Sequence, residues 1–373
     1  MSDNLSTLDS LPDEILTNVF VRLPIKSIVT CTAVCKTWKS LIQKPTFISN
    51  HLHHSSNNKH PLLLFRLCPL EPDEANEKEQ YVLHFDNQDF NEYTRFVDFH
   101  LHDTGYAGIY HVVGTCNGLV FLADDIDGIE NHFFLWNPCV RKFVELPIPD
   151  ITCGWYSVGF GFDSKANDYK VVRFVTLEEE GQKGKSPPEV EVYSLSTGNW
   201  RMVTALPPIG TINRERAAFV NGALHWVALR KTGNKFLNFV IVFDLGEEVF
   251  REIALPKLSD ENGDESLVSV SISAYGNSLA LFQRESNCLS IWVMEHYADA
   301  SSWTKIVSFA DSRCKPKGFR KSGEVILEMD GGYLKTGDLK TKEVKDLGIR
   351  GREYADNFVD SYVESLVLLD KPN

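Results

Sequence analysis

The chain has 373 residues, 43% of them hydrophobic, and a formal net charge of −13 at pH 7. An acidic chain is poorly suited to bind nucleic acid through its phosphates, which requires a basic surface, and no run of 18 or more apolar residues is present to span a bilayer. Eight cysteines without a CxxC pair are too few for a disulfide framework. We therefore expect reduced thiols, no nucleic-acid binding, no membrane insertion, and a protein as the partner.

The first ten residues, MSDNLSTLDS, include Asp3 and Asp9 and lack the basic and apolar regions of a secretory signal peptide. We therefore expect the protein in the cytoplasm, the nucleus or both. The length allows two or three average domains, or one small unit followed by a large one. A change of pattern near residue 60 favours the second division.

The stretch 11–47 has the pattern of two or three short helices. Pro12 suits a helix start, because the first-turn N–H groups lack partners there, and Pro24 ends the first helix near Leu23. The first helix has an amphipathic stripe: Ile15, Leu16, Val19, Phe20 and Leu23. Further apolar positions follow at Ile25, Ile28, Val29, Val34, Cys35, Trp38, Leu41 and Ile42. A unit this small buries little apolar surface by itself, so a partner is expected.

This stretch resembles an F-box, the helical motif that docks on the Skp-type adaptor of cullin-RING ubiquitin ligases. The resemblance rests on LPDEIL at 11–16, on Leu23-Pro24, and on VCKTWKSLI at 34–42. It implies a docking surface formed or supported by nine residues: Leu11, Pro12, Ile15, Leu16, Leu23, Pro24, Val34, Cys35 and Trp38. It also implies that Phe20 belongs to the core of the module. The alternative is a helical cap that packs only on its own domain.

A polar run without periodicity, HLHHSSNNKH at 51–60, predicts a linker over residues 49–60. Its four histidines could bind a metal, but no acidic or cysteine ligand accompanies them, which favours a solvated loop. Cys31 and Cys35 lie one helical turn apart, yet two thiols without a second pair are better explained by packing. The acidic stretch 71–79 is expected to be an exposed loop between two strands.

From about residue 60 the pattern changes to short apolar strands separated by turn residues, which predicts an all-β domain. A phrase recurs there: LWNPCVRKFVELP ending at Pro147, VYSLSTGNWRMVTALP ending at Pro207, and VFDLGEEVFREIALP ending at Pro256. Looser copies end at Phe309 and Ile349, and another hairpin lies upstream of each copy. Repeats of about 40 to 60 residues with four strands each are typical of a β-propeller.

Five copies and the leftover strands at 62–101 predict six blades, if a strand from the far end of the chain completes the last one. The segment Tyr362–Leu369 is predicted to be that strand, since ring closure removes exposed strand edges. The expected fold is thus a small all-α module over 1–48, a linker, and an all-β domain over 61–373, built as a six-bladed propeller. The alternative is one or two open β-sandwiches, against which the regular period argues.

Catalytic and metal-binding patterns are sparse in the β region. Asp124, Asp125 and Asp127 lack the EF-hand spacing with a glutamate at position 12, and they fit a hairpin turn better than a calcium site. His225 beside Trp226 has no Ser or Cys nucleophile motif nearby and is predicted to be a packed core histidine. We expect no catalytic residue, no metal and no cofactor.

The β region also resembles the F-box-associated domain of plant F-box proteins, which is related to kelch domains. The resemblance rests on GTCNGLVFL (114–122), LWNP (135–138), GFGFDSKANDYKVV (159–172), VEVYS (190–194), NGALHWVA (221–228) and YVESLVLL (362–369). Strict kelch repeats carry paired glycines followed by spaced Tyr and Trp residues, and this sequence lacks that pattern.

The two resemblances together imply the substrate-recognition subunit of an SCF (Skp–cullin–F-box) ubiquitin ligase. The F-box would dock the Skp-type adaptor and through it the cullin-RING ligase, while the β domain presents an unidentified target protein. The alternative is a kelch-like propeller enzyme or sugar-binding module with a helical cap. An extracellular enzyme would normally carry a secretory signal, and none is visible.

Loops at one rim of a propeller are its usual contact surface, and long insertions map to that rim. The segments 176–188 and 258–266 are rich in acidic residues, and 123–131 is a third candidate loop. Acidic loops would suit a basic patch on the target. The candidate substrate contacts are Glu178, Glu179 and Glu180.

Overall fold

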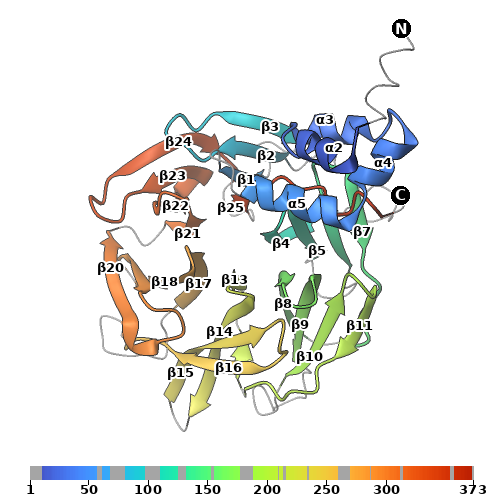
Figure 1. Ribbon diagram of the computed structural model, residues 1–373. Helices are drawn as coiled ribbons and strands as arrows, with labels where there is room; N and C mark the ends of the chain where they lie inside the picture. The colour runs from blue at the N-terminus through green and yellow to red at the C-terminus, as the bar shows by residue number, and fades with distance from the viewer. Residues whose placement is uncertain are drawn as a thin grey trace, which may run out of the picture.

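The structure is a computed structural model. It describes residues 11–56, 61–67, 80–96, 110–124, 132–152, 155–176, 188–208, 210–212, 216–232, 235–258, 269–285, 287–310, 314–352 and 357–371. These residues form a helical module beside a ring of six β-sheets (Figure 1). The prediction of a small helical unit followed by a six-bladed propeller is therefore confirmed. No helix in the described part of the chain has the length and apolar character needed to cross a membrane.

The helical module contains α2 (Asp13–Phe20), α3 (Ile25–Cys31), α4 (Lys36–Ile42) and α5 (Pro45–Ser56). Pro12 and Pro24 directly precede α2 and α3, as the sequence predicted. Cys35 caps α4, since its Sγ accepts the backbone N–H of Trp38 at 3.4 Å. The module's core consists of Leu16, Phe20, Ile25, Ile28, Trp38, Leu41, Ile42, Phe47 and Ile48.

Helix α5 continues through Ser56, so the expected linker from residue 49 is helical along most of its length. Phe47, Ile48 and His51 are buried on one side of α5, at the i, i+1 and i+4 spacing of a helix. The polarity of the histidine concealed this spacing in the sequence. Residues 57–60 lie outside the described residues.

The propeller has six antiparallel sheets, and in each blade the strands are named from the axis outward. Blade 1 contains β25 (Phe358–Tyr362), β1 (Leu62–Leu67), β2 (Gln80–Phe85) and β3 (Glu92–Phe96). Blade 2 contains β4 (Tyr110–Cys116), β5 (Leu119–Asp124), β6 (Phe133–Asn137) and β7 (Lys142–Glu145). Blade 3 contains β8 (Trp155–Asp163), β9 (Asp168–Thr176), β10 (Glu189–Ser194) and β11 (Asn199–Met202).

The remaining blades follow the same order. Blade 4 contains β12 (Thr211–Ile212) and β13 (Ala218–Val220), which both pair with β14 (Ala223–Thr232), then β15 (Lys235–Asp244) and β16 (Phe250–Ala254). Blade 5 contains β17 (Ser269–Tyr275), β18 (Ser278–Arg284), β19 (Leu289–Met294) and β20 (Trp303–Phe309). Blade 6 contains β21 (Lys315–Phe319), β22 (Val325–Glu328), β23 (Tyr333–Gly337) and β24 (Val344–Arg350). Short 3₁₀ helices lie at Ala300–Ser302 and Asp330–Gly332.

The recurring sequence phrase corresponds to the two outer strands of a blade and the turn between them. In blades 2, 4 and 6 the third strand, or the residue after it, supplies a side chain whose Oδ1 accepts backbone N–H groups of the turn: Asn137, Asp244 and Asp338. Four positions later the backbone has a positive φ, at Arg141 (54°), Glu248 (54°) and Lys342 (62°). The three turns are therefore equivalent, with an Asn or Asp that starts the turn.

Aromatic residues of the phrase join neighbouring blades. The indole N–H of Trp200 donates to the carbonyl of Pro147 at 2.6 Å, and that of Trp303 donates to the carbonyl of Ala254 at 3.1 Å. Each bond links the outermost strand of one blade to the end of the outermost strand of the preceding blade, or to the residues just after it. The phrase therefore supplies a contact between blades 2 and 3 and between blades 4 and 5.

The ring is closed by β25, which lies earlier in the chain than the predicted segment Tyr362–Leu369. β25 pairs antiparallel with β1, from Leu62 opposite Tyr362 to Arg66 opposite Phe358. The strand ends at Tyr362, and residues 363–371 leave the ring and run along the helical module instead. Four apolar residues are buried there, which explains why the segment looks strand-like in sequence: Leu366, Val367, Leu368 and Leu369.

Strand directions separate the two faces of the ring. The turn face carries the tight turns between first and second strands, such as 117–118 and 221–222, together with the start of β1 and therefore the helical module. Because the sheets are antiparallel, second-to-third strand connections and crossings between blades lie at the opposite face, the loop face. The strand ends that flank 125–131, 177–187 and 259–268 all lie at the loop face.

Candidate functional site

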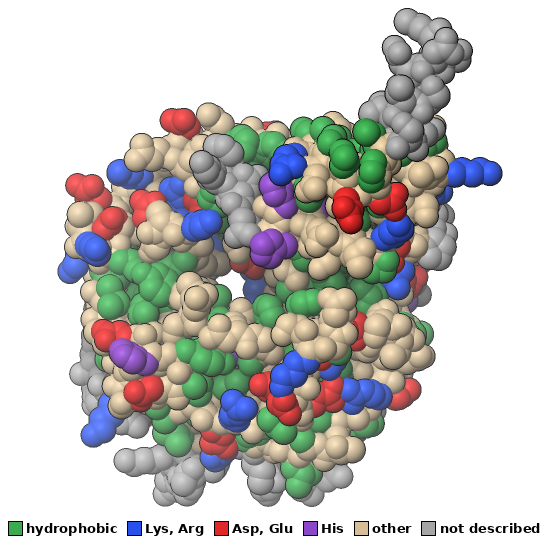
Figure 2. Space-filling view, in the orientation of Figure 1, with side chains coloured by type: hydrophobic (Ala, Val, Ile, Leu, Met, Phe, Trp, Pro, Cys, Tyr) green, Lys and Arg blue, Asp and Glu red, His purple; other side chains and the backbone are tan. Residues whose placement is uncertain are grey.

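Helix α2 divides its apolar residues between two sides. Leu16 and Phe20 are buried in the module's core, whereas Ile15 is 47% exposed and Val19 is 49% exposed. Val34, just before α4, is 47% exposed as well. We call these three residues with Pro12 and Pro24, which are also exposed, the exposed apolar set. Figure 2 shows apolar side chains gathered over α2. Gathered apolar side chains on so small a module mark a contact surface.

The nine predicted docking residues occupy three environments. Pro12, Ile15, Pro24 and Val34 are exposed, and Leu11, Leu23 and Cys35 are half-buried. Leu16 and Trp38 are buried, so a contact through them would act by shaping the surface from below. The Trp38 ring packs edge-on against Phe20 with centroids 4.9 Å apart. The docking role of all nine stays a prediction.

Val19 was not among the predicted docking residues, although it belongs to the same sequence stripe. Its spacing of four from Ile15 places both on one helix face, and this was the available signal. Asp13 of α2 forms an exposed ion pair with Lys44 at 2.9 Å, but it lies two positions from Ile15 and therefore on another side of the helix. Such an exposed pair contributes only about 0–1 kcal/mol to stability.

A cavity of about 660 Å³ lies on the axis of the ring, lined mainly by the innermost strands. Its charged side chains include Arg216, Lys317 and Asp360, and Ser55 and Ser56 of α5 reach it at the turn face. Thr115 donates to Asp360 at 3.1 Å, and burial raises the pKa of this carboxyl while Arg216 lowers it. The cavity is therefore polar and could admit a charged segment of a ligand.

Among the described residues, no group of three or more His, Cys, Asp or Glu side chains is arranged to hold a metal ion. Asp125 and Asp127 lie outside those residues. Burial raises the pKa of Cys31, so its thiol remains protonated at neutral pH. Glu178, Glu179 and Glu180 also lie outside the described residues.

His225 is a packed core histidine, as predicted. It is fully buried, with Nδ1 3.0 Å from the carbonyl of Ala218 and Nε2 3.0 Å from the hydroxyl of Tyr297. Burial lowers its pKa to about 4, while the hydrogen bond to the Ala218 carbonyl raises it in part. Its role is to join the first strand pair of blade 4 to blade 5.

The lowered pKa of His225 predicts that the protein loses stability in acid. The unfolded chain binds a proton at His225 below pH 6.5 or so, whereas the folded chain does not until about pH 4. Folding stability is therefore unaffected above about pH 6.5 and decreases by about 3 kcal/mol between there and pH 4 from this residue. Urea unfolding at several pH values should show this slope, and His225→Gln should reduce it. An unchanged slope in the variant would contradict the assignment.

Two family profiles agree with this architecture. The profile described as "F-box associated beta propeller domain" matches residues 78–368, and that of the "F-box domain" matches residues 8–50. F-box protein CPR1 of Arabidopsis thaliana is 28% identical over 91% of this chain and 85% of its own length. An F-box/kelch-repeat protein of the same plant is 26% identical over 80% of this chain and 79% of its own. A 6-phosphogluconolactonase-like structure from Bacteroides fragilis superposes with a TM-score of 0.40 at 7% identity, over 82% of this chain and 99% of its own.

Proposed function

The chain belongs to the F-box proteins that carry an F-box associated β-propeller domain, and we propose that it is the substrate-recognition subunit of an SCF ubiquitin ligase. The helical module docks the Skp-type adaptor and through it the cullin-RING ligase. The propeller binds the target protein. In this role the chain performs no covalent chemistry itself. It holds a target beside a ubiquitin-charged enzyme, which makes the transfer of ubiquitin effectively intramolecular.

The observation that carries the proposal is the two-sided character of the helical module. One side of α2 packs Leu16 and Phe20 into a core continuous with the propeller. The other side exposes Ile15 and Val19. An interface needs such an apolar centre surrounded by polar groups, and a few central side chains carry most of its binding energy.

The geometry separates the two binding partners. The helical module lies at the turn face, and the strand ends that flank the long acidic segments lie at the loop face. We assign target binding to the loop face. A role for Glu178, Glu179 and Glu180 there stays a prediction. Neutralising all three should slow association with a basic target at low salt, and an unchanged on-rate would exclude them.

Substitution of Ile15 tests the adaptor interface. Ile15→Asp places a charge within the exposed apolar set without touching the core, so the chain should fold normally. A central apolar contact is worth about 2 kcal/mol, so we expect about 30-fold weaker binding to a purified Skp-type adaptor, measured by titration calorimetry.

The matched control is Val344→Asp, which alters a 43% exposed apolar residue on β24 of the propeller. This variant should bind the adaptor as tightly as the unmodified chain does. Equal adaptor affinity of the Ile15 and Val344 variants would remove the exposed apolar set from the interface. Failure of the unmodified chain to bind any Skp-type adaptor would overturn the proposed function as a whole.

A further inference from the structure

Three of the sequence segments that resemble the family meet at one place in the fold. They are 114–122, 135–138 and 362–369, which belong to blade 2 and to the chain that follows β25. We call residues 363–371 the C-terminal strap. Ser365, Leu366 and Leu368 of the strap are almost fully buried, and its path leads from the ring to the helical module. In Figure 1 the C-terminus lies beside α4 and β7.

Asn137 holds the strap on the propeller side. This fully buried residue donates through Nδ2 to the carbonyl of Ser365 at 2.9 Å and to the carbonyl of Val367 at 2.8 Å. Its Oδ1 accepts the N–H of Cys139 at 2.9 Å, which starts the turn after β6. One amide side chain thus performs two tasks.

The equivalent turns show why an asparagine is needed at this position. Asp244 and Asp338 start the same turn in blades 4 and 6 with a carboxylate oxygen alone. A carboxylate accepts but cannot donate, so it can form the turn yet cannot bind the two strap carbonyls. The amide of Asn137 is therefore specific to the strap and is not demanded by the turn.

Gly118 leaves room for the strap. A Cβ at this position would lie 2.4 Å from Ser365 Oγ and 2.5 Å from the carbonyl oxygen of Val363. Gly222 occupies the same place in the Asn-Gly turn of blade 4, with φ of 76° against 80° at Gly118, and no atom lies within 4 Å of its Cβ position. Both positions have a positive φ, which favours glycine. Only at Gly118, beneath the strap, would a side chain also clash with neighbouring atoms.

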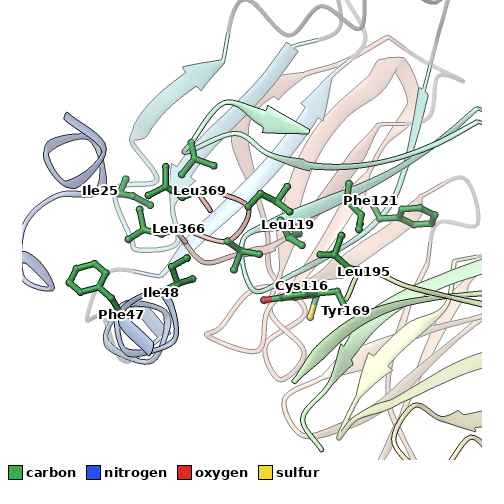
Figure 3. Close-up of a cluster of buried hydrophobic side chains, with 14 of the residues drawn as sticks. Ile25, Phe47, Ile48, Cys116, Leu119, Phe121, Tyr169, Leu195, Leu366 and Leu369 are labelled. Carbon is green, nitrogen blue, oxygen red and sulfur yellow. The ribbon is translucent and has the colours of Figure 1, made fainter. Parts of the chain in front are cut away.

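The other side of the strap contacts the helices. Gln43, which follows α4 directly, donates through Nε2 to the carbonyl of Leu369 at 2.9 Å. Figure 3 shows Leu366 and Leu369 between the helical residues Ile25 and Ile48 and the propeller residue Leu119. All five belong to one continuous buried core. The strap therefore fills the joint between the two modules.

We propose that the C-terminal strap is a positioning device that fixes the adaptor-binding helices at one orientation relative to the propeller, with Asn137 and Gly118 as its positioning residues. The reason given for a fixed orientation rests on the proposed function as a ligase subunit. Ubiquitin transfer depends on the target being held where the ligase can reach it, and a joint that pivots would lower that effective concentration. The exposed apolar set does not take part in the joint.

Two matched pairs of variants test the strap in the full-length chain. Asn137→Asp keeps the turn and removes the donor, whereas Asp338→Asn makes the reverse change in an equivalent turn without a strap. Gly118→Ala adds a methyl group beneath the strap, whereas Gly222→Ala adds one in open space. The backbone amides of Leu369 and Lys371, which donate to Leu366 at 2.9 Å and Leu368 at 3.0 Å, report strap attachment by hydrogen exchange. We expect them to exchange at least about tenfold faster in the Asn137 and Gly118 variants, since buried hydrogen bonds are lost.

Orientation is measured separately by single-molecule energy transfer between dyes at Lys39 of α4 and Lys345 of β24, both exposed. We expect one narrow distance distribution for the unmodified chain and both controls, and a broad one for the two strap variants, with adaptor affinity unchanged. Narrow distributions in both strap variants, or equal broadening in the controls, would overturn the proposal. If Asn137→Asp fails to fold, the glycine pair decides the result. If the unmodified chain bound no adaptor, the proposed function would be refuted. The distance distributions would still show whether the strap fixes the helical module on the propeller.

Discussion

Deletion of residues 358–373 is expected to prevent the propeller from closing and to yield insoluble or protease-sensitive protein. The deletion removes β25, the innermost strand of blade 1, and leaves the edge of β1 without its partner. Phe358, Val359 and Tyr362 are buried in that strand, and they contribute about 6 kcal/mol together at ~2 kcal/mol each. A loss of this size is comparable to the whole stability of a typical domain, about 5–15 kcal/mol. Limited proteolysis and thermal melting measure the result.

The matched control is deletion of residues 363–373, which keeps β25 and removes only the strap. The Tyr362 hydroxyl still donates to the carbonyl of Gly118 at 3.1 Å, so the ring should stay closed and melt cooperatively. The helices should become sensitive to protease, because the leucines of the joint are gone. Melting of the longer deletion at the temperature of the full-length chain would contradict closure by β25.

Replacing Glu191 with leucine is expected to lower the free energy of unfolding by about 3–5 kcal/mol. Glu191 on β10 and Arg173 on β9 are fully buried, and their side chains form an ion pair at 2.7 Å. Arg173 also donates to the carbonyl of Ile151 at 2.7 Å, and Glu191 accepts the N–H of the same residue at 3.0 Å. Removing one partner leaves a buried charge without its counter-charge, which is the costly change.

A double-mutant cycle separates this cost from the value of the pair. Replacing both residues, Arg173→Met with Glu191→Leu, removes both charges from the core, so the double variant should be more stable than either single one. Chemical unfolding of the four proteins gives the coupling energy. If the losses in free energy of unfolding of the two single variants simply added in the double variant, the ion pair would not be coupled, which would contradict the prediction.

Local patterns made the blades predictable. The turn-starting Asp or Asn recurs because blades 2, 4 and 6 use the same turn. The outer-strand tryptophan recurs because it contacts the end of the preceding blade, as Trp200 contacts Pro147. The two prolines before α2 and α3 act within a few residues of their own positions. The burial of His225 was also predictable, since no nucleophile pattern surrounds it and apolar residues flank it.

Other features were hidden because sequence polarity does not report burial. His51 was predicted to belong to a polar linker, but it is buried midway along α5. Arg173 and Glu191 are charged residues within otherwise apolar strands, and only the pairing of β9 with β10 places them opposite each other as a buried ion pair. The stripe of α2 reads as a single apolar face, whereas packing buries Leu16 and leaves Ile15 in solvent.

The sequence by itself determined the helical module, the all-β ring, the number of blades and the family, because these follow from short-range patterns repeated along the chain. Only the tertiary structure decided that the closing strand ends at Tyr362 and that the residues after it form the strap. The hydrogen bonds of Asn137 to Ser365 span 228 positions, and that of Gln43 to Leu369 spans 326. Contacts of this separation exist only after the ring has closed and brought the two ends of the chain together, so no local pattern can encode them.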